Sequence, residues 1–266
     1  MIGLIHILKR LPNLSQEEFR QYWRETHGPL VVKHTQSLGI SRYIQDHKIE
    51  DPINDVQKKI LGVQDLYDGI DELWWNFRAE PGKALTSPEG KQAYQELVED
   101  EREFIDFSNS ALAFEVEVPY INSTEKIVAR EKSNILKRTG VFRKLPNLSV
   151  AEAQLYWRTD HATLLLPFMS ATHVLRYIQL HVIEHPLIDS LRAMHGNMGE
   201  PFEGTSAIWI DRSLTAPVEA TPEYKRAYQD IVFADRRNLV DLKRGSIWVN
   251  KEYVFIDKCY PDVLSL

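Results

Sequence analysis

The pentapeptide Leu11-Pro12-Asn13-Leu14-Ser15 occurs twice in this chain of 266 residues, and its second copy is Leu145-Pro146-Asn147-Leu148-Ser149. Two more stretches repeat at the same offset of 134 residues, namely Tyr22-Trp23-Arg24 with Tyr156-Trp157-Arg158, and Arg42-Tyr43-Ile44-Gln45 with Arg176-Tyr177-Ile178-Gln179. A constant offset across several segments indicates that one unit was duplicated. We therefore predict two homologous domains in tandem, residues 1–125 and 130–266.

Each copy predicts the same order of secondary structure. Ser15 with Glu18, and Ser149 with Glu152, have the spacing of capping boxes, which begin helices. Serine or threonine followed by proline, at residues 87–88 and 221–222, predicts the start of a second helix in each copy. Apolar or alternating stretches predict the strands: residues 2–8, 42–49, 73–77 and 112–118 in the first copy, and 139–142, 176–183, 207–210 and 247–255 in the second.

The resulting order, β-α-β-β-α-β, is that of a ferredoxin-like domain, in which both helices cover one face of a four-stranded antiparallel sheet. The other face of the sheet then needs cover. Two such units in one chain can bury these faces against each other. We therefore predict an α+β fold in which two tandem ferredoxin-like domains form an intramolecular dimeric α+β barrel.

The composition narrows the class of protein. Asp and Glu number 38 against 32 for Lys and Arg, and this acidic balance argues against nucleic acid as a partner. The single cysteine, Cys259, allows neither an internal disulfide nor a thiolate cluster. The sequence shows no signal peptide and no apolar run of membrane-spanning length. We expect a cytoplasmic protein that does not bind membranes.

The repeated histidines define the candidate site. His27 shares a helical face with Phe19, Trp23 and other apolar residues, so it should point toward the core. In the strand that follows, Tyr43, Gln45 and His47 share one face, and the same types recur in the second copy. The alternation leaves open which face meets the helices. If the polar row does, it meets His27 in one pocket, and its counterparts meet His161 in a second.

The run Tyr22-Trp23-Arg24-Glu25-Thr26-His27-Gly28-Pro29, followed by Arg42-Tyr43-Ile44-Gln45-Asp46-His47, resembles the signature of the EthD domain family of the dimeric α+β barrel superfamily. The resemblance covers both halves, although the second copy has Ala162-Thr163 in place of the Gly-Pro pair. It implies a small cofactor-independent protein, and the family includes lyases that decarboxylate or dehydrate polyketide-type aromatics. Relatives in the wider superfamily are isomerases, cyclases, cofactor-free monooxygenases and haem proteins.

Histidine can transfer a proton near neutral pH without a metal, so we predict that His27, His161, His47 and His181 are catalytic. Arginine and tyrosine can hold a carboxylate or a developing oxyanion, and tryptophans supply flat apolar walls. The predicted substrate-binding residues are Arg42, Tyr43, Gln45, Trp23 and Trp74, with Arg176, Tyr177, Gln179, Trp157 and Trp209 in the second copy. We predict no metal site, because His181, His185 and His195 are expected on a strand end and a loop, without helical ligand spacing.

The predicted function is that of a cofactor-independent lyase that decarboxylates or dehydrates a phenolic or polyketide-like acid. The alternatives are a cofactor-free isomerase or monooxygenase, and a non-enzymatic carrier of haem or another small ligand. The expected partner is a small aromatic substrate, and a homodimer of the fused pair is a further expectation. A purely structural interpretation also stands: the histidines and Tyr-Trp pairs belong to the core, and the Tyr-Gln-His row is a polar network that holds the domains in register.

Overall fold

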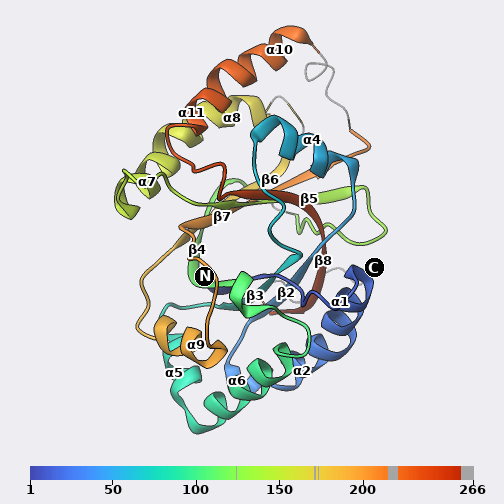
Figure 1. The fold of residues 1–266 in the computed structure, drawn as a ribbon, viewed down its shortest axis with the longest axis vertical. Coiled ribbons are helices and arrows are strands. Elements are labelled where there is room, and N and C mark those ends of the chain that lie inside the picture. Colours follow the sequence, from blue (N-terminus) through green and yellow to red (C-terminus); the bar gives the residue numbers. More distant parts are fainter. Residues whose placement is uncertain (124, 171, 173, 215–220, 259–266) are drawn as a thin grey trace.

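The computed structural model describes residues 1–123, 125–170, 172, 174–214 and 221–258, and Cys259 lies outside them. Eight strands close into an antiparallel barrel in the order β1-β3-β2-β8-β5-β7-β6-β4 (Figure 1). Their bounds are β1 (Ile2–Leu8), β2 (Arg42–Lys48), β3 (Gly69–Trp75), β4 (Ala111–Ile121), β5 (Ile135–Phe142), β6 (Val174–Val182), β7 (Gly204–Asp211) and β8 (Ser246–Asp257).

Each half contributes four strands in the same order, β4-β1-β3-β2 from the first half and β8-β5-β7-β6 from the second. The two sheets join at both edges, where β2 pairs with β8 and β4 pairs with β6. The predicted mixed fold with a barrel is confirmed. The halves meet through edge pairing rather than only by stacking sheet faces, and closure leaves no unpaired edge among the eight described strands.

Several strands are longer than their hydrophobic pattern predicts. The predicted strand at residues 112–118 extends to Ile121 in β4, and the one at 139–142 begins at Ile135 in β5. These extensions pair with strands far away in the sequence: the end of β4 pairs with β6 of the other half, and the start of β5 lies between β7 and β8 of its own half. Because partners distant in sequence hold these residues, the local pattern understates the strand lengths.

Helices cover the outside of the barrel at two opposite ends (Figure 1). The capping boxes at Ser15 and Ser149 are both present, and Ser87 and Thr221 cap the second helices as predicted. The first half contains α1 (Gln16–Tyr22), the π-helix η1 (Trp23–His27), α2 (Gly28–Lys33), α3 (Thr35–Leu38), α4 (Pro52–Leu61), α5 (Glu80–Thr86), α6 (Pro88–Glu101) and the short η2 (Phe107–Asn109). The second contains α7 (Val150–Tyr156), the π-helix η3 (Trp157–His161), α8 (Ala162–Ser170), α9 (Ile188–His195), α10 (Pro222–Ala227), the π-helix η5 (Tyr228–Phe233) and α11 (Ala234–Arg236).

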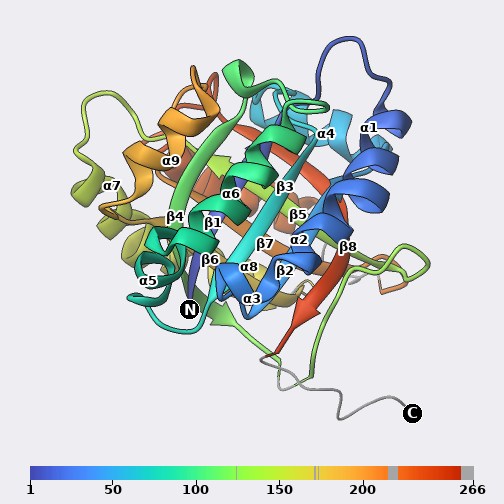
Figure 2. The same cartoon turned by 90° about the horizontal axis from the view of Figure 1, so that it is seen from below.

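Two helices cross to the other half of the molecule. The sequence predicts only a connection between the second and third strands of each copy, but the structure has α4 and α9 there. The end of α4 lies near α11 of the second half, since Ile60 and Ala234 line one cavity, whereas α9 lies beside α6 of the first half (Figure 2). His195 is therefore the last residue of a helix and not part of a loop, which corrects the sequence interpretation.

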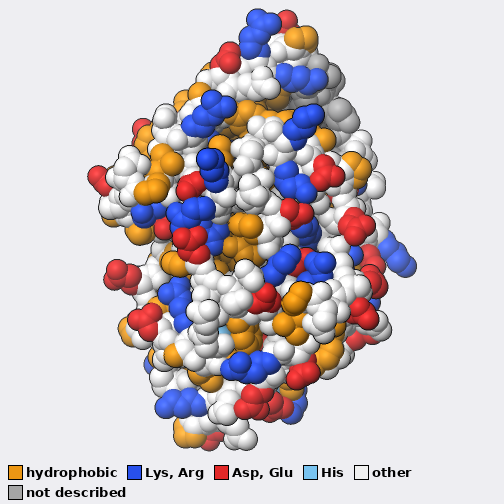
Figure 3. Space-filling model, viewed as in Figure 1, with side chains coloured by type: hydrophobic (Ala, Val, Ile, Leu, Met, Phe, Trp, Pro, Cys, Tyr) orange, Lys and Arg blue, Asp and Glu red, His pale blue; other side chains and the backbone are white. Residues whose placement is uncertain are grey.

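Helices cover the first-half strands on the outside, and the molecular surface carries mixed charges. In the view from below, α2 and α6 lie across the strands β1, β3 and β2 (Figure 2). Positive and negative side chains are interspersed over the face in Figure 3, so that face carries no extended field of one sign. Within the part of the chain that the structure describes, no helix combines the length and the apolar character needed to cross a bilayer.

Candidate active site

A histidine and an aspartate form the same pair in each half. Nδ1 of His27 lies 2.7 Å from Oδ2 of Asp100 at the end of α6. Nδ1 of His161 lies 2.6 Å from Oδ2 of Asp235 in α11. A carboxylate can only accept, so Nδ1 carries the proton in both pairs, and Nε2 is the basic nitrogen of the neutral ring.

A tyrosine one helical turn before each histidine orients the aspartate. The hydroxyl of Tyr22 donates to Oδ1 of Asp100 at 2.9 Å, and Tyr156 donates to Oδ1 of Asp235. Burial and the bond to Asp100 raise the pKa of Tyr22 to about 12, and the bond to Asp235 raises the pKa of Tyr156 to about 12. Both hydroxyls thus remain protonated donors, and each half holds a Tyr-Asp-His arrangement.

The polar row of the second strand faces the helices, which decides the orientation that the alternation left open. Nε2 of Gln45 donates to the carbonyl oxygen of Trp23 at 2.8 Å and contacts the hydroxyl of Tyr43 at 2.6 Å. Gln179 makes the same two contacts, with Trp157 and Tyr177. The carbonyl oxygen of Trp23 also accepts a hydrogen bond from the backbone N–H of Gly28, so the Gln45 amide is a second donor that ties the π-helix to the strand.

His47 and His181 complete this network. Nε2 of each lies 2.9 Å from Oε1 of its glutamine, and the His47 ring stacks on Trp23 with centroids 4.1 Å apart. Burial lowers the pKa of His47 well below its usual value and that of His181 to about 4. These two histidines therefore bind glutamines that anchor the π-helices.

A cavity of about 80 Å³ adjoins His161 in the second half. Trp157 and Tyr177, two of the residues that the sequence predicts to bind substrate, line this cavity. Leu61 from α4 of the first half lies on one side of it. Other apolar walls come from Phe142, Leu165, Ile208, Leu239 and Leu242. Because Nδ1 of His161 is bound to Asp235 and Nε2 has no hydrogen-bond partner among the described residues, the basic nitrogen is free to act beside this cavity.

Two arginines, Arg138 from β5 and Arg236 from α11, also line the cavity. Burial, and next the positive charge of Arg236, lower the pKa of His161 below its usual value. Burial also lowers the pKa of Arg138, but a guanidinium remains charged at neutral pH. The cavity therefore combines a neutral imidazole base with fixed positive charge and apolar walls.

The corresponding region of the first half is filled with side chains. His6 and Asp71, which are paired across β1 and β3, occupy the positions of Gly140 and Ser206, which are paired across β5 and β7. Phe104 lies against His27 with ring centroids 5.2 Å apart. Burial lowers the pKa of His27, but Asp100, Asp71 and Glu101 outweigh it, so the net shift is upward. His27 is thus buried and inclined to carry charge.

The remaining predicted residues lie on the other side of the sheet. Arg42 and Arg176 stack on Trp74 and Trp209 inside the barrel, with guanidinium carbons 4.3 and 4.7 Å from the ring centroids. A small cavity of about 30 Å³ adjoins these four residues together with Lys137. The structure therefore separates them from His27 and His161, which the sequence placed with them in one candidate set.

The sequence interpretation did not include the partners that make the histidines distinctive. Asp100, Asp235, Arg138 and Arg236 carry no local motif, because their roles arise from helices and strands that meet only in the fold. One signal was available: Asp100 and Asp235 are 135 residues apart, close to the repeat offset, and they follow the similar stretches Lys91-Gln92-Ala93-Tyr94-Gln95 and Lys225-Arg226-Ala227-Tyr228-Gln229. Buried charges in the barrel, above all Lys137 at 2.5 Å from Asp46 and 2.8 Å from Glu72, were missed as well.

Comparisons with solved structures place the fold. An anthrone oxidase-like protein is 11% identical with a TM-score of 0.50, and the match covers 97% of this chain and 94% of that one. An ethyl tert-butyl ether d (ethd) family protein from Bacillus halodurans C-125 is 16% identical, with a TM-score of 0.29, over 43% of this chain and 95% of that one. A mutant chlorite dismutase from Candidatus Nitrospira defluvii is 11% identical, with a TM-score of 0.43, over 96% and 91%.

Among curated proteins, no match to this chain was found. The model of the EthD domain matches two segments, residues 11–108 and 145–243. These segments cover most of the chain, one in each half, as expected from a tandem duplication, and each contains a Tyr-Asp-His arrangement. The chain belongs to the EthD domain family, with two copies of the domain.

Proposed function

We propose that this protein is an enzyme whose active site is the cavity beside His161 in the second half. The observation that carries the proposal is the free basic nitrogen of a neutral histidine that lines an apolar cavity together with two arginines. We take each half to be a ferredoxin-like domain. In this arrangement the first half supplies a wall of the cavity through Leu61 rather than a second active site.

The reaction proposed is loss of carbon dioxide or water from a phenolic or polyketide-like acid without a cofactor. His161 acts as general base and then as general acid, and Asp235 holds its tautomer. Arg138 and Arg236 bind the carboxylate or the oxyanion that develops on the substrate. A cavity of this size accommodates the reacting end of the substrate rather than a fused ring system.

For a hydroxybenzoic acid the steps balance as follows. Nε2 of His161 takes the phenolic proton, and the phenolate pushes an electron pair into the ring. The imidazolium returns this proton to the ring carbon that bears the carboxylate. The bond between that carbon and the carboxylate then breaks, its electron pair restores the aromatic ring, carbon dioxide leaves, and water protonates the phenolate. His161 ends neutral, as it began.

The test is turnover of hydroxybenzoic acids with the hydroxyl ortho or para to the carboxylate, followed by carbon dioxide release. His161→Gln is expected to lose about 10²- to 10⁴-fold in kcat, the usual contribution of a positioned acid–base group. His27→Gln is the matched control, because it removes the same dyad from the half whose histidine lies against filled space. Circular dichroism verifies that both variants fold.

Equal activity of His161→Gln and the wild type would contradict the proposal. Oxygen consumption that accompanies substrate loss would instead identify a cofactor-free monooxygenase, since the same anion can react with oxygen. A Soret band in the purified protein that disappears in His161→Gln would identify a haem carrier.

A further inference from the structure

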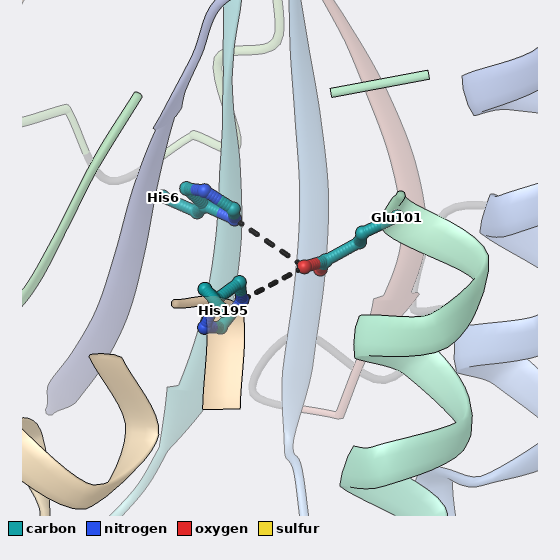
Figure 4. A group of neighbouring side chains, drawn as sticks. All are labelled: His6, Glu101 and His195. Atoms are coloured by element: carbon teal, nitrogen blue, oxygen red, sulfur yellow. Dashed lines mark hydrogen bonds and ion pairs between the residues drawn. The ribbon is translucent and has the colours of Figure 1, made fainter. Parts of the chain in front are cut away.

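His6, Glu101 and His195 meet in the first half, at a place that the proposed reaction does not use (Figure 4). His6 comes from β1, Glu101 from the end of α6, and His195 from the end of α9, which crosses over from the second half. All three are buried, with relative exposures of 4%, 7% and 2%. One ligand atom from each lies within 4.8 Å of the other two.

The distances fit a shared ion better than a complete set of hydrogen bonds. Nε2 of His195 lies 2.9 Å from Oε2 of Glu101, and Nδ1 of His6 lies 3.8 Å from the same oxygen. The second separation is too long for a hydrogen bond. It is short enough for both atoms to contact one metal ion, since metal–nitrogen and metal–oxygen bonds are about 2.0–2.2 Å long.

The ring of His195 is held in the orientation that a metal ligand needs. Its Nδ1 lies 2.8 Å from the carbonyl oxygen of Leu191, and because a carbonyl only accepts, Nδ1 carries the proton. Its Nε2 faces Oε2 of Glu101 at 2.9 Å, and a bound metal ion would replace the proton between these two atoms. A backbone carbonyl behind a histidine is the usual outer partner of a metal-bound imidazole.

The second imidazole has a polar atom left over. Nε2 of His6 is buried and has no hydrogen-bond partner in the described part of the chain. Nδ1 of the same ring faces Glu101, so a metal ion bound there would leave the ring proton on Nε2.

The surroundings supply further negative charge. Asp71 pairs with His6 across β1 and β3, so another carboxyl group lies near the three side chains. Nε2 of His27 lies 3.9 Å from Oε1 of Glu101, so three imidazoles surround this carboxylate. The positions of His6 and His195 correspond by the repeat offset to Gly140 and Leu61, which line the cavity of the second half.

We propose that His6, Glu101 and His195 bind one divalent first-row transition metal ion, with two imidazole nitrogens and a carboxylate oxygen as ligands. Imidazole ligands favour ions such as Zn²⁺, Fe²⁺ or Co²⁺ over Mg²⁺ or Ca²⁺, which prefer all-oxygen sites. The ion links β1 and α6 of the first half to α9 of the second. This site is independent of the acid–base chemistry proposed at His161.

The experiment uses the full chain stripped with EDTA and titrated with Co²⁺, followed by calorimetry and by the visible ligand-field absorption of the bound ion. We expect one Co²⁺ per chain and a higher Tm with Zn²⁺, because binding to the folded state stabilises it. Glu101→Gln keeps the side-chain shape, and His195→Leu introduces the residue found at position 61. Each is expected to weaken Co²⁺ binding by more than about 100-fold, beyond the usual effect of an outer partner.

His34→Gln is the matched control, since Nε2 of His34 also lies 2.9 Å from a glutamate, Glu96, but nearer the surface. It should bind Co²⁺ like the wild type. If His195→Leu fails to fold, Glu101→Gln decides. Absence of Co²⁺ and Zn²⁺ binding to the stripped wild type, or undiminished binding by Glu101→Gln, would overturn the proposal. Turnover of hydroxybenzoic acids, measured in parallel, reports separately on His161.

Discussion

The two halves share a Tyr-Asp-His arrangement but surround its histidine with opposite charge. In the first half, carboxylates outweigh burial and raise the pKa of His27. In the second half, burial and Arg236 lower the pKa of His161. Two exchanges at equivalent positions contribute to this difference: Glu101 at the end of α6 corresponds to Arg236 at the end of α11, and Asp71 corresponds to Ser206.

The halves also differ in how the space beside the histidine is used. His6 and Asp71 fill it in the first half, whereas Gly140 and Ser206 leave a cavity in the second. The crossing helices reinforce this contrast, because α9 brings His195 to the first half and α4 brings Leu61 to the second. Duplication thus preserved the hydrogen-bonded frame while the packed residues diverged, and we infer that the halves have separate tasks.

The largest expected effect comes from Asp235→Asn. The amide no longer requires a proton on Nδ1 of His161, so the basic nitrogen is lost from the cavity side, and kcat should fall by about 10²- to 10⁴-fold. The matched variant Asp100→Asn should leave kcat unchanged, because His27 lies against filled space. Steady-state kinetics with the hydroxybenzoic acids measures kcat of both variants. Equal losses in the two variants would contradict an active site in the second half alone.

Filling the cavity should have the next largest effect. A Cβ at Gly140 would lie 2.8 Å from Oγ of Ser206, so Gly140→Ala displaces one flexible side chain. Gly140→Val adds two more carbons in a strand that accepts β-branched residues, and it should lower kcat by about 10²-fold through misplacement of the substrate. Thermal unfolding would show whether the chain still folds, since overpacking costs about 1–3 kcal/mol. Full activity in Gly140→Val would show that the reaction does not take place in this cavity.

Where the halves are alike, stability should respond alike. Gln45→Ala leaves Nε2 of His47 without its buried partner and removes the side-chain donor to the Trp23 carbonyl, and Gln179→Ala does the same to His181 and Trp157 in the second half. Each loss is expected to lower the free energy of unfolding by about 3 kcal/mol. Urea unfolding measures both values. A large effect in one half and none in the other would contradict the idea of a common frame.

The smallest expected effect is on the pH dependence of activity. Because the pKa of His161 is lowered, the neutral base persists below pH about 6.5, the ordinary histidine value, and the acidic limb of kcat/KM should lie below that pH. Arg236→Gln removes a positive charge that disfavours the imidazolium, so it should move this limb to higher pH. If the acidic limb moves to lower pH in Arg236→Gln, the positive charge of Arg236 does not lower the pKa of His161.

Much of the frame could be read from the sequence because it depends on short-range interactions. The capping boxes at Ser15 and Ser149 act over three residues, and the alternation around Gln45 requires only a strand. The inward direction of His27 follows from helical spacing, and the residue is 1% exposed. The helix α4 has a local start signal in Asp51-Pro52, but Val56 and Ile60 are each 52% exposed, so its apolar residues do not form a clear buried face.

The amino-acid sequence by itself indicated the duplication, the order of most elements and the family. Repeated residues and the spacing of capping residues can be recognised along one chain. Only the tertiary structure decided which strand face meets the helices, how β2 with β8 and β4 with β6 close the barrel, and which histidine adjoins a cavity. The strand face is decided by contacts such as Gln45 with Trp23, 22 positions apart, and the other outcomes by contacts over longer separations, such as the 74 positions between His161 and Asp235. A local pattern carries no record of which distant side chain fills a space or supplies a charge.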